Sequence, residues 1–384
     1  MSLINGYLNN EVYAIVNDVH AQAAGSKNVA VIDTQSFVDY GNAVLSSNDN
    51  SETFMNTLIL QMARMYTTWR PYTSALKDLI VTGEEWGAIY QKIDAEVGDF
   101  VSDETYDLVD GQSVDQYVVR KPTAKQKLFV RRSPYKNYIT IGRQQLKVAF
   151  QSEGDFAAFV AMVFGKMRIK LDFALENLAR LAIANYIGTI TAQGKTGLVF
   201  PLVTMYNNAT GSSLTGGIDG TAAFNKDFMA YAAAEIELIS KRLRNLSTSY
   251  NAEGAERHTP QGEQRFLVLD EFQTRLQHVV QYQAFHKELV SLREFVEVPY
   301  WQGESARTTI KCTVDDGDGG TTNQTVENII ACVFDRYALG TFRSEEETDT
   351  TPYNASGRYY NTFHFAEQLW YNDLSENFVY FTLN

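Results

Sequence analysis

Residues 152–186 carry the stretch SEGDFAAFVAMVFGKMRIKLDFALENLARLAIANY, which decides the fold. Its apolar side chains recur every three or four residues from Phe156 to Leu181, and this is the period of an amphipathic helix. Ser152 and Asp155 have the spacing of a capping box, so we expect the helix to begin there. A helix of this length spans ~50 Å and would serve as the structural spine of the molecule.

The segment that precedes this helix separates its charges. Residues 84–115 contain ten acidic side chains and one basic side chain, Lys92, whereas residues 120–147 contain nine basic side chains and no acidic one. Side chains alternate along the second half, with Ile139 and Ile141 between aromatic or polar neighbours, and this alternation predicts extended strands. We therefore expect a projecting loop with an acidic leg and a basic leg.

Two interpretations of this loop stay open. In the first, the legs neutralise each other as an antiparallel hairpin, although exposed ion pairs contribute only about 0 to 1 kcal/mol each. In the second, the loop docks on an oppositely charged neighbouring subunit, where complementarity sets partner and register more than affinity. The second interpretation gives these candidate contacts between subunits: Glu84, Glu85, Asp94, Glu96, Asp103, Glu104, Lys121, Lys125, Lys127, Arg131 and Arg132.

The chain before the loop is predicted as an arm, not as a compact domain. Within residues 1–83, short helical patterns at 8–19 and 54–65 flank a polar patch at 46–51. The second pattern ends before Pro71, as helices commonly do.

The chain after the spine is predicted as a mixed α/β layer. A loop rich in glycine, threonine and serine at 191–220 precedes a helix that begins beyond Thr221, with Phe224 and Leu246 at the ends of its apolar face. A strand at 266–269 then leads into a helix capped at Asp270. Further strands are expected at residues 295–298, 308–314 and 326–337, and two aromatic-rich strands close the chain between residues 359 and 383.

Composition excludes several classes of protein. The chain has 384 residues, 45% hydrophobic and 21% charged, which is ordinary for a globular protein. A net charge of −13 argues against a general nucleic-acid binder, because affinity for phosphates needs clustered lysine and arginine. No apolar run approaches the roughly 18 residues of a membrane span, and the N-terminus lacks a signal-peptide core, so we expect a protein made in a cytoplasm without membrane contact. Cys312 and Cys332 are expected to be small core residues.

A nucleotide-binding site is suggested by two short motifs, and their context argues against it. Gly194-Lys195-Thr196 is similar to the end of a Walker A loop, and residues 266–271 are similar to a Walker B strand. Five residues separate Gly188 from Gly194 where four are required, and the loop follows a predicted helix where a strand is required.

No other pattern indicates catalysis or a cofactor. The turn DDGDGG at residues 315–320 has closely spaced carboxylates but lacks the bidentate glutamate of a calcium loop. The five histidines form no HExxH pair, and no Gly-x-Ser-x-Gly elbow is present. We expect no catalytic residue, no cofactor and no metal.

Element order and two motifs resemble the tailed-bacteriophage major capsid proteins of the Hong Kong 97 type. VFDRYALG at residues 333–340 is similar to the strand that leaves the axial domain in that family. YYNTF, WYNDL and ENFVYF, within residues 359–381, are similar to the closing strands of its peripheral domain. Arm, two-legged loop, spine helix, α/β domain and returning strands follow in the family's order over essentially the whole chain.

The resemblance implies an α+β fold with four parts. These are an N-terminal arm at residues 1–83, an extended loop at 84–147, a peripheral domain at 148–190 and 341–384, and an axial domain at 191–340. It implies a structural subunit, not an enzyme, that assembles with itself into hexamers and pentamers around packaged double-stranded DNA. The expected location is the virion after assembly in the host cytoplasm, with a portal protein as partner and scaffolding or decoration proteins as optional ones.

Some members of this family cross-link a loop lysine to an asparagine of the C-terminal domain. Lys121, Lys125 or Lys127 with Asn354 or Asn361 are the corresponding candidates, although no motif fixes the pair. Two alternative functions stay open at this point: an encapsulin-like nanocompartment shell, which has the same fold class, and a P-loop nucleotidase.

Overall fold

The structure is a computed structural model that describes most of the chain. Its described residues are 31–46, 76–82, 90–96, 121–130, 132–150, 165–281, 295–315 and 320–384, with single residues and short pieces at 3–19, at 74 and at 98–119. The capping pair Ser152 and Asp155 and the helical pattern at 54–65 lie outside the described residues. Within the pattern at 8–19, residues 13, 14, 16, 17 and 19 are helical, whereas Leu8 ends a short strand, β2 (Tyr7–Leu8), which pairs with β1 (Leu3–Ile4).

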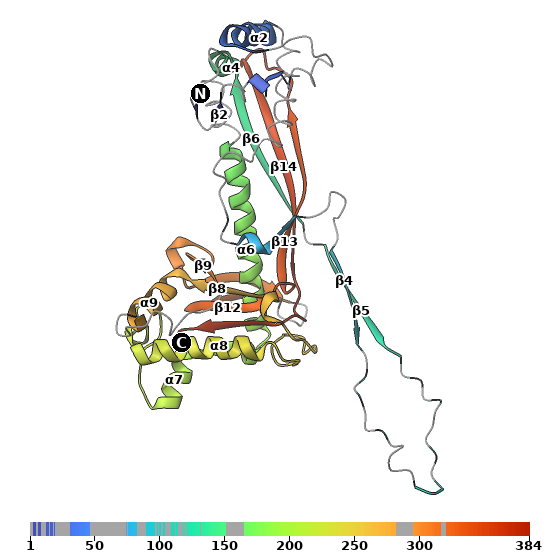
Figure 1. The fold of residues 1–384 in the computed structure, drawn as a ribbon, viewed down its shortest axis with the longest axis vertical. Helices are drawn as coiled ribbons and strands as arrows, with labels where there is room; N and C mark the ends of the chain where they lie inside the picture. The colour runs from blue at the N-terminus through green and yellow to red at the C-terminus, as the bar shows by residue number, and fades with distance from the viewer. Residues whose placement is uncertain are drawn as a thin grey trace.

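The spine helix is present as α6, which spans Lys166–Ala192. Its 27 residues are about 40 Å long at 1.5 Å per residue, and it stands beside the long sheet in Figure 1. Leu171, Leu175 and Leu178 are buried at the predicted spacing. The helix continues past the predicted stretch and ends where Gly194 adopts a φ of +64° and the Lys195 N–H donates to the Ile190 carbonyl at 3.0 Å.

A four-stranded sheet lies beside the spine. Its strand order is β3 (Ile80–Thr82), β13 (Leu339–Thr350), β14 (Tyr359–Asn372) and β6 (Arg132–Gly142). Strand β6, which lies within the predicted loop at 84–147, pairs with β14 along its whole length. The alternation in β6 serves this sheet, because Ile141 is buried while Tyr138 is exposed on the other face.

A five-stranded sheet forms the second layer. Its order is β7 (Val199–Pro201), β15 (Phe378–Thr382), β12 (Ile329–Asp335), β8 (Gln264–Leu269) and β9 (Val296–Val298). Of the two closing strands, β15 pairs with β12 and β7 in this sheet, whereas β14 lies in the four-stranded sheet. Every residue of β12 and β15 is buried, as is usual for central strands covered on both faces.

Helices and a hairpin cover the five-stranded sheet and the spine. The helices are α7 (Leu202–Thr210), α8 (Lys226–Arg242) and α9 (Asp270–Gln281), and the hairpin consists of β10 (Ile310–Asp315) and β11 (Thr321–Val326). Figure 1 shows these helices gathered around one end of the spine. The predicted apolar face of α8 is buried, but Phe224 and Leu246 are 62% and 64% exposed because they lie outside the helix.

A helical pair caps the far end of the long sheet. Helices α2 (Thr34–Ser46) and α4 (Arg143–Ala149) meet there, and the rings of Phe37 and Phe150 are 5.7 Å apart. Sequence analysis missed α2. Its signals were a cap at Asp33, whose side chain accepts from the Ser36 N–H at 2.8 Å, and buried residues at helical spacing.

The spine and the β10–β11 hairpin touch at Gly188. A Cβ atom at this position would stand 2.2 Å from the Cys312 Sγ and 3.2 Å from Val314 Cγ1. The Cys312 thiol also lies 3.4 Å from the Ala184 carbonyl, as expected for a small packed side chain. Glycine is therefore required here for a close approach between helix and strand.

We predict that Gly188→Ala lowers the free energy of unfolding of the unassembled subunit by about 1–3 kcal/mol, because the added methyl overpacks this contact. Cys312→Ala in the same chain should recover part of the loss, since it removes the clashing sulfur. Urea denaturation measures both effects, with Gly262→Ala as the control because no atom lies within 4 Å of a Cβ there. Equal stability of Gly188→Ala and the wild type would contradict the contact.

Candidate functional site

The predicted projecting loop begins as an antiparallel hairpin. Strand β4 (Tyr90–Glu96) pairs with β5 (Thr123–Phe129), and the hairpin extends away from both sheets in Figure 1. The register places Asp94 opposite Lys125, so an acid of one leg does face a base of the other. Lys92, however, stands opposite Lys127, and these two like charges need other partners.

A cluster of seven charged residues, here called the root cluster, supplies those partners. Lys92 Nζ lies 2.5 Å from Asp373 Oδ2 and also bonds to Glu376. Lys127 Nζ lies 2.8 Å from Asp373 Oδ1 and 2.7 Å from Glu253 Oε1. The members are Lys92, Asp94, Lys127, Glu253, Arg257, Asp373 and Glu376.

Arg257 closes the cluster on its other side. Its guanidinium donates to the Asp94 carboxylate, and its Nε is 3.2 Å from Glu376 Oε1. Acidic and basic side chains alternate through the cluster. Each partly buried charged side chain therefore has a side chain of opposite charge beside it. The hairpin is thus held to its own subunit by three of its side chains, Lys92, Asp94 and Lys127.

The turn between β14 and β15 positions the two central acids. Ser375 donates to Asp373 Oδ1 through its hydroxyl at 2.7 Å and its N–H at 3.1 Å, which forms a local side-chain turn. Tyr186 of the spine donates to the carbonyls of Asp373 and Glu376, both at 3.1 Å. The buried spine helix therefore fixes the acids that receive the hairpin.

A second loop brings Glu253 and Arg257 to the same place. The Asn251 side chain accepts from the Ala255 N–H at 2.7 Å and donates to its carbonyl at 2.6 Å. Gly254 takes a φ of +70° in this tight turn. The Ala252 and Glu253 N–H groups both donate to the Leu374 carbonyl, so the two loops are bonded to each other.

The electrostatics of the cluster favour its charged state. Burial by itself would raise the pKa of Asp373, but hydrogen bonds from Lys127 and Lys92 lower it from 3.8 to about 2. Burial would likewise lower the pKa of Lys92, and its bonds to Asp373 and Glu376 raise it above the ordinary value. Asp373 consequently stays ionised at any pH above strong acid.

The other candidate contacts fall in different surroundings. Asp103, Lys121 and Lys125 are exposed, whereas Asp94 and Lys127 belong to the root cluster. Glu84, Glu85, Glu104 and Arg131 lie outside the described residues, as do the side chains of Glu96 and Arg132. Contact of these residues with a neighbouring subunit stays a prediction.

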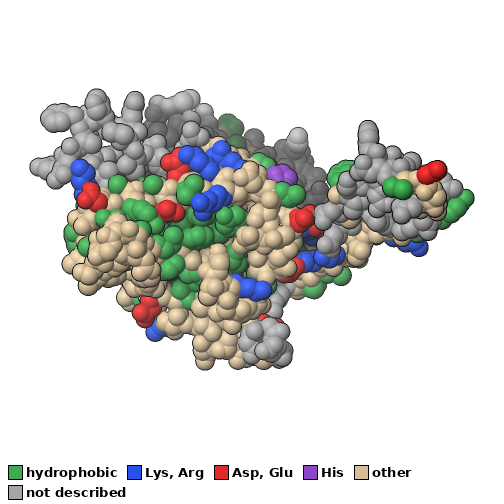
Figure 2. All heavy atoms as spheres, turned by 90° about the horizontal axis from the view of Figure 1, so that it is seen from below, with side chains coloured by type: hydrophobic (Ala, Val, Ile, Leu, Met, Phe, Trp, Pro, Cys, Tyr) green, Lys and Arg blue, Asp and Glu red, His purple; other side chains and the backbone are tan. Residues whose placement is uncertain are grey.

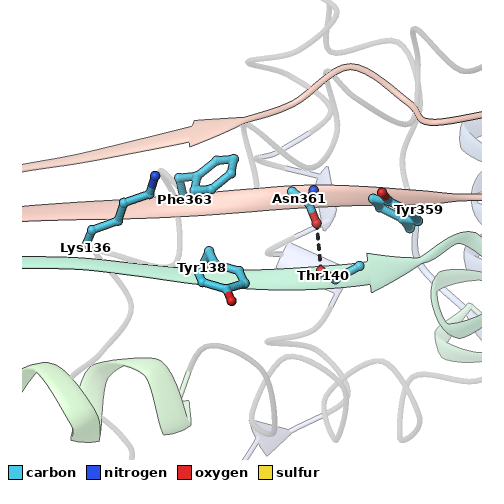
Figure 3. Close-up of a pocket in the computed structure, with 6 residues that line it drawn as sticks. All are labelled: Lys136, Tyr138, Thr140, Tyr359, Asn361 and Phe363. Atoms are coloured by element: carbon cyan, nitrogen blue, oxygen red, sulfur yellow. Dashed lines mark hydrogen bonds between the residues drawn. The ribbon is translucent and has the colours of Figure 1, made fainter. Parts of the chain in front are cut away.

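The two cross-link candidates of the C-terminal region lie near the far end of the long sheet. Asn361 Oδ1 accepts from the Thr140 hydroxyl at 2.7 Å, and Asn354 donates to the Tyr359 hydroxyl at 3.2 Å. Figure 3 shows Asn361 and Thr140 facing each other across β14 and β6, in a shallow cleft of about 550 Å³. Lys136 Nζ stands 4.6 Å from the centre of the Phe363 ring in the same cleft. A cross-link to either asparagine stays a prediction.

Sequence analysis missed four members of the root cluster, Glu253, Arg257, Asp373 and Glu376. Each is separated from the hairpin by more than 120 residues, so no local pattern joins them. Two signals were present. Lys92 was the one base in the acidic leg, and Asp373 lies in the motif WYNDL, among the aromatic residues of the closing strands.

The apparent nucleotide motifs have no common site. Gly194 and Lys195 follow the C-terminal end of α6, and Thr196 opens a 3₁₀ turn that leads into β7, so this loop does not open a phosphate-binding helix. Among the described residues no group of three His, Cys, Asp or Glu side chains could hold a metal ion, and residues 316–319 of the acidic turn lie outside them. No helix in the described part of the chain is long and apolar enough to cross a membrane.

Comparison with solved structures shows the fold. The capsid of Staphylococcus phage Andhra is similar with a TM-score of 0.50 and 12% identity, over 80% of this chain and 83% of that chain. The mature capsid of bacteriophage PhiM1 matches with a TM-score of 0.43 and 12% identity, over 82% and 88%. The capsid of cyanophage P-SCSP1u matches with a TM-score of 0.46 and 10% identity, over 83% and 91%. The fold is that of a tailed-phage capsid protein of the Hong Kong 97 type.

The family follows from the sequence itself. A model of the Phi29-like phage major capsid protein family matches residues 12–382, and the chain belongs to that family. No curated protein matches. The chain is therefore a structural subunit that associates with itself to form the virion shell, and it is not an enzyme. This result replaces the nanocompartment and nucleotidase alternatives.

The root cluster predicts a dependence of stability on pH. The folded-state pKa of Asp373 is about 2 against 3.8, so its ionisation stabilises the fold above pH 4, and this contribution is lost as the pH falls from 4 to 2. The loss should reach about 2 kcal/mol, at 1.36 kcal/mol for each pKa unit. Urea denaturation of the unassembled subunit across this range measures it.

Asp373→Asn should remove this dependence and should also cost roughly 3 kcal/mol at pH 7, because Lys92 and Lys127 lose their shared carboxylate. Asp349→Asn, an exposed strand residue, is the control. The role of Asp373 would be refuted by an Asn variant whose stability follows pH between 4 and 2 as the wild type does.

Proposed function

We propose that copies of this chain form hexamers and pentamers that close an icosahedral shell around packaged double-stranded DNA. The observation that carries this proposal is the hairpin, which is clamped at its root and extends away from both sheets of the subunit (Figure 1). A clamped projection has a defined direction, so it can meet a neighbouring copy in the same place around a closed ring.

The two sheets suggest that the subunit has two domains. We assign the long sheet and the spine to the peripheral domain, and the five-stranded sheet with α7, α8 and α9 to the axial domain. The assignment differs from the sequence expectation in giving β6 to the peripheral domain and β15 to the axial domain. The hairpin proper is then β4, β5 and the loop between them.

The net charge of −13 supports the role of a shell that encloses DNA without binding it tightly. An acidic wall does not bind the phosphate backbone, since such binding needs clustered cations, and the enclosed DNA can therefore pack against it without being held in place. We expect no sequence-specific binding of DNA. Assembly in the host cytoplasm with a portal protein, and with scaffolding or decoration proteins where they exist, completes the proposal.

Charged residues of the loop outside the root cluster are candidates for docking on a neighbour. The segment between β4 and β5 holds acids such as Asp110, which is exposed. Two basic residues that follow β5 in the sequence, Arg131 and Arg132, carry the opposite charge. Complementary charges of this kind would set the register between copies.

We predict that Arg131→Glu with Arg132→Glu gives a folded subunit that does not close shells, because it reverses the charge that sets this register. Negative-stain electron microscopy of the purified protein detects closed particles, and circular dichroism verifies folding. Lys195→Glu with Lys226→Glu changes the net charge equally at exposed sites on the five-stranded-sheet side and should leave assembly intact. Normal particles from the Arg131 and Arg132 variant would rule out this docking model.

A further inference from the structure

A cleft of about 530 Å³, here called the α8 cleft, lies between α8 and the β9 edge of the five-stranded sheet. One wall is the second half of α8 with Arg244 just beyond it, and the other is the start of β8, the turn that precedes it, and β9. Figure 1 shows α8 running alongside this sheet. Small-molecule sites are commonly clefts of roughly 300–1,000 Å³, so the α8 cleft has the size of a ligand site.

Hydrogen bonds fix the two walls of the cleft against each other. The Ser240 hydroxyl of α8 donates to Gln264 Oε1 of β8 at 2.6 Å, and the Gln264 side-chain amide donates to the Ser240 carbonyl at 2.9 Å. The same amide donates to the Thr259 carbonyl at 3.0 Å. Because Ser240 and Gln264 both line the cleft, its shape is set within the single subunit.

Three basic residues line the cleft, Lys241, Arg244 and Arg265. Lys241 pairs with Glu237 at 2.7 Å, but neither arginine forms an ion pair with a carboxylate in the described part of the chain. Arg265 donates to two neighbouring backbone carbonyls, at 3.2 and 3.4 Å, and its buried Nε–H has no partner among the described residues. A guanidinium presents paired N–H donors that match the oxygens of a phosphate or a carboxylate. The cleft therefore presents two such groups to an anionic ligand.

The cleft is basic within an acidic chain. Its lining has three bases against two acids, Asp78 and Glu237, whereas the whole chain carries a net charge of −13. Seen from below, a compact group of Lys and Arg side chains lies beside hydrophobic side chains on the body of the subunit (Figure 2). A local excess of positive charge attracts an anion, but the acidic chain as a whole repels a long polyanion. The charge balance thus favours a small anionic ligand.

An aromatic pair lines the same cleft. The rings of Phe266 and Phe295 have centres 6.3 Å apart and planes at 71° to each other, and both side chains are partly exposed. Aromatic rings of this kind accept the flat face of a nucleobase, because every base has a π face. The cleft therefore combines a surface for a planar ring with two guanidinium groups for an anion.

We propose that the α8 cleft binds a nucleoside phosphate, with the phosphate on Arg244 and Arg265 and the base against Phe266 and Phe295. Packaged duplex DNA offers the same phosphates, but its bases are stacked inside the helix and would have to be flipped out to reach the two phenylalanines. A free nucleotide offers both groups at once. The site lies within one subunit, so the inference does not depend on the closure of a shell.

Isothermal titration calorimetry of the unassembled subunit tests the class of ligand. Deoxyadenosine monophosphate should bind with a dissociation constant of about 0.1–1 mM. Inorganic phosphate and deoxyadenosine each carry one half of the recognised chemistry and should each bind at least tenfold more weakly. The inference would be overturned if the monophosphate did not bind, or if inorganic phosphate bound equally well. A short DNA duplex that binds where the monophosphate does not would overturn it in favour of a contact with packaged DNA.

Charge-matched variants locate the phosphate. Arg244→Gln with Arg265→Gln should weaken the binding of deoxyadenosine monophosphate at least tenfold. Lys226→Gln with Arg242→Gln removes the same charge from exposed positions of α8 outside the cleft and should keep the affinity within about twofold of the wild type. Equal losses in the two double variants would mean that net charge, not the cleft, attracts the ligand, and the inference would fail.

A third variant locates the base. Phe295→Leu should weaken the binding of deoxyadenosine monophosphate several-fold and leave the binding of inorganic phosphate unchanged, because only the base contacts the ring. Urea denaturation verifies that each variant folds. An unchanged affinity of Phe295→Leu for the monophosphate would contradict the placement of the base. All of these measurements use the unassembled subunit, so a negative result leaves the proposed function intact.

Discussion

The arrangement of the molecule depends on one buried carboxylate. The Asp373 carboxylate forms ion pairs with Lys92 of β4 and Lys127 of β5, and the Asp373 carbonyl accepts a hydrogen bond from Tyr186 of the spine. A single turn thereby joins the projecting hairpin, the two sheets and the spine helix. Because both lysines share this carboxylate, its loss would leave two partly buried cations without their closest counter-charge, and the hairpin would lose its defined direction.

The turn that contains Asp373 also lies where the chain passes between the two sheets. Strand β12 leads to β13 through Ala338, and β14 leads to β15 through residues 373–377. Hydrogen bonds join these two connecting segments. The Asp373 N–H donates to the Ala338 carbonyl at 2.7 Å, and the Asp335 N–H donates to the Asn377 carbonyl at 2.9 Å. The hairpin is thus attached at a rigid junction. Rigidity at this point matters for a shell subunit, because a small change of angle at the root of the hairpin causes a large displacement of its far end.

Local patterns predicted the elements, and long-range contacts decided their arrangement. The helical period of α6, the cap at Asp270 and the aromatic strands at the C-terminus are properties of short stretches, so the sequence alone indicated them. The sheet to which β15 belongs depends on pairing with β12 and β7, and no local signal distinguishes that from pairing with β14. The same holds for the root cluster, in which Lys92 and Asp373 are 281 residues apart. The charge separation of the loop was visible in the sequence, but its use within the subunit was not.

The central claim is that a hairpin clamped by Asp373 links neighbouring copies of a closed shell. Cryo-electron microscopy of particles assembled from the purified chain tests it most directly. Closed icosahedral particles are expected, in which Lys92 and Lys127 remain on Asp373 in each copy and the hairpin lies against a neighbouring copy. Particles in which the hairpin has left Asp373, or in which it contacts no neighbouring copy, would contradict this claim.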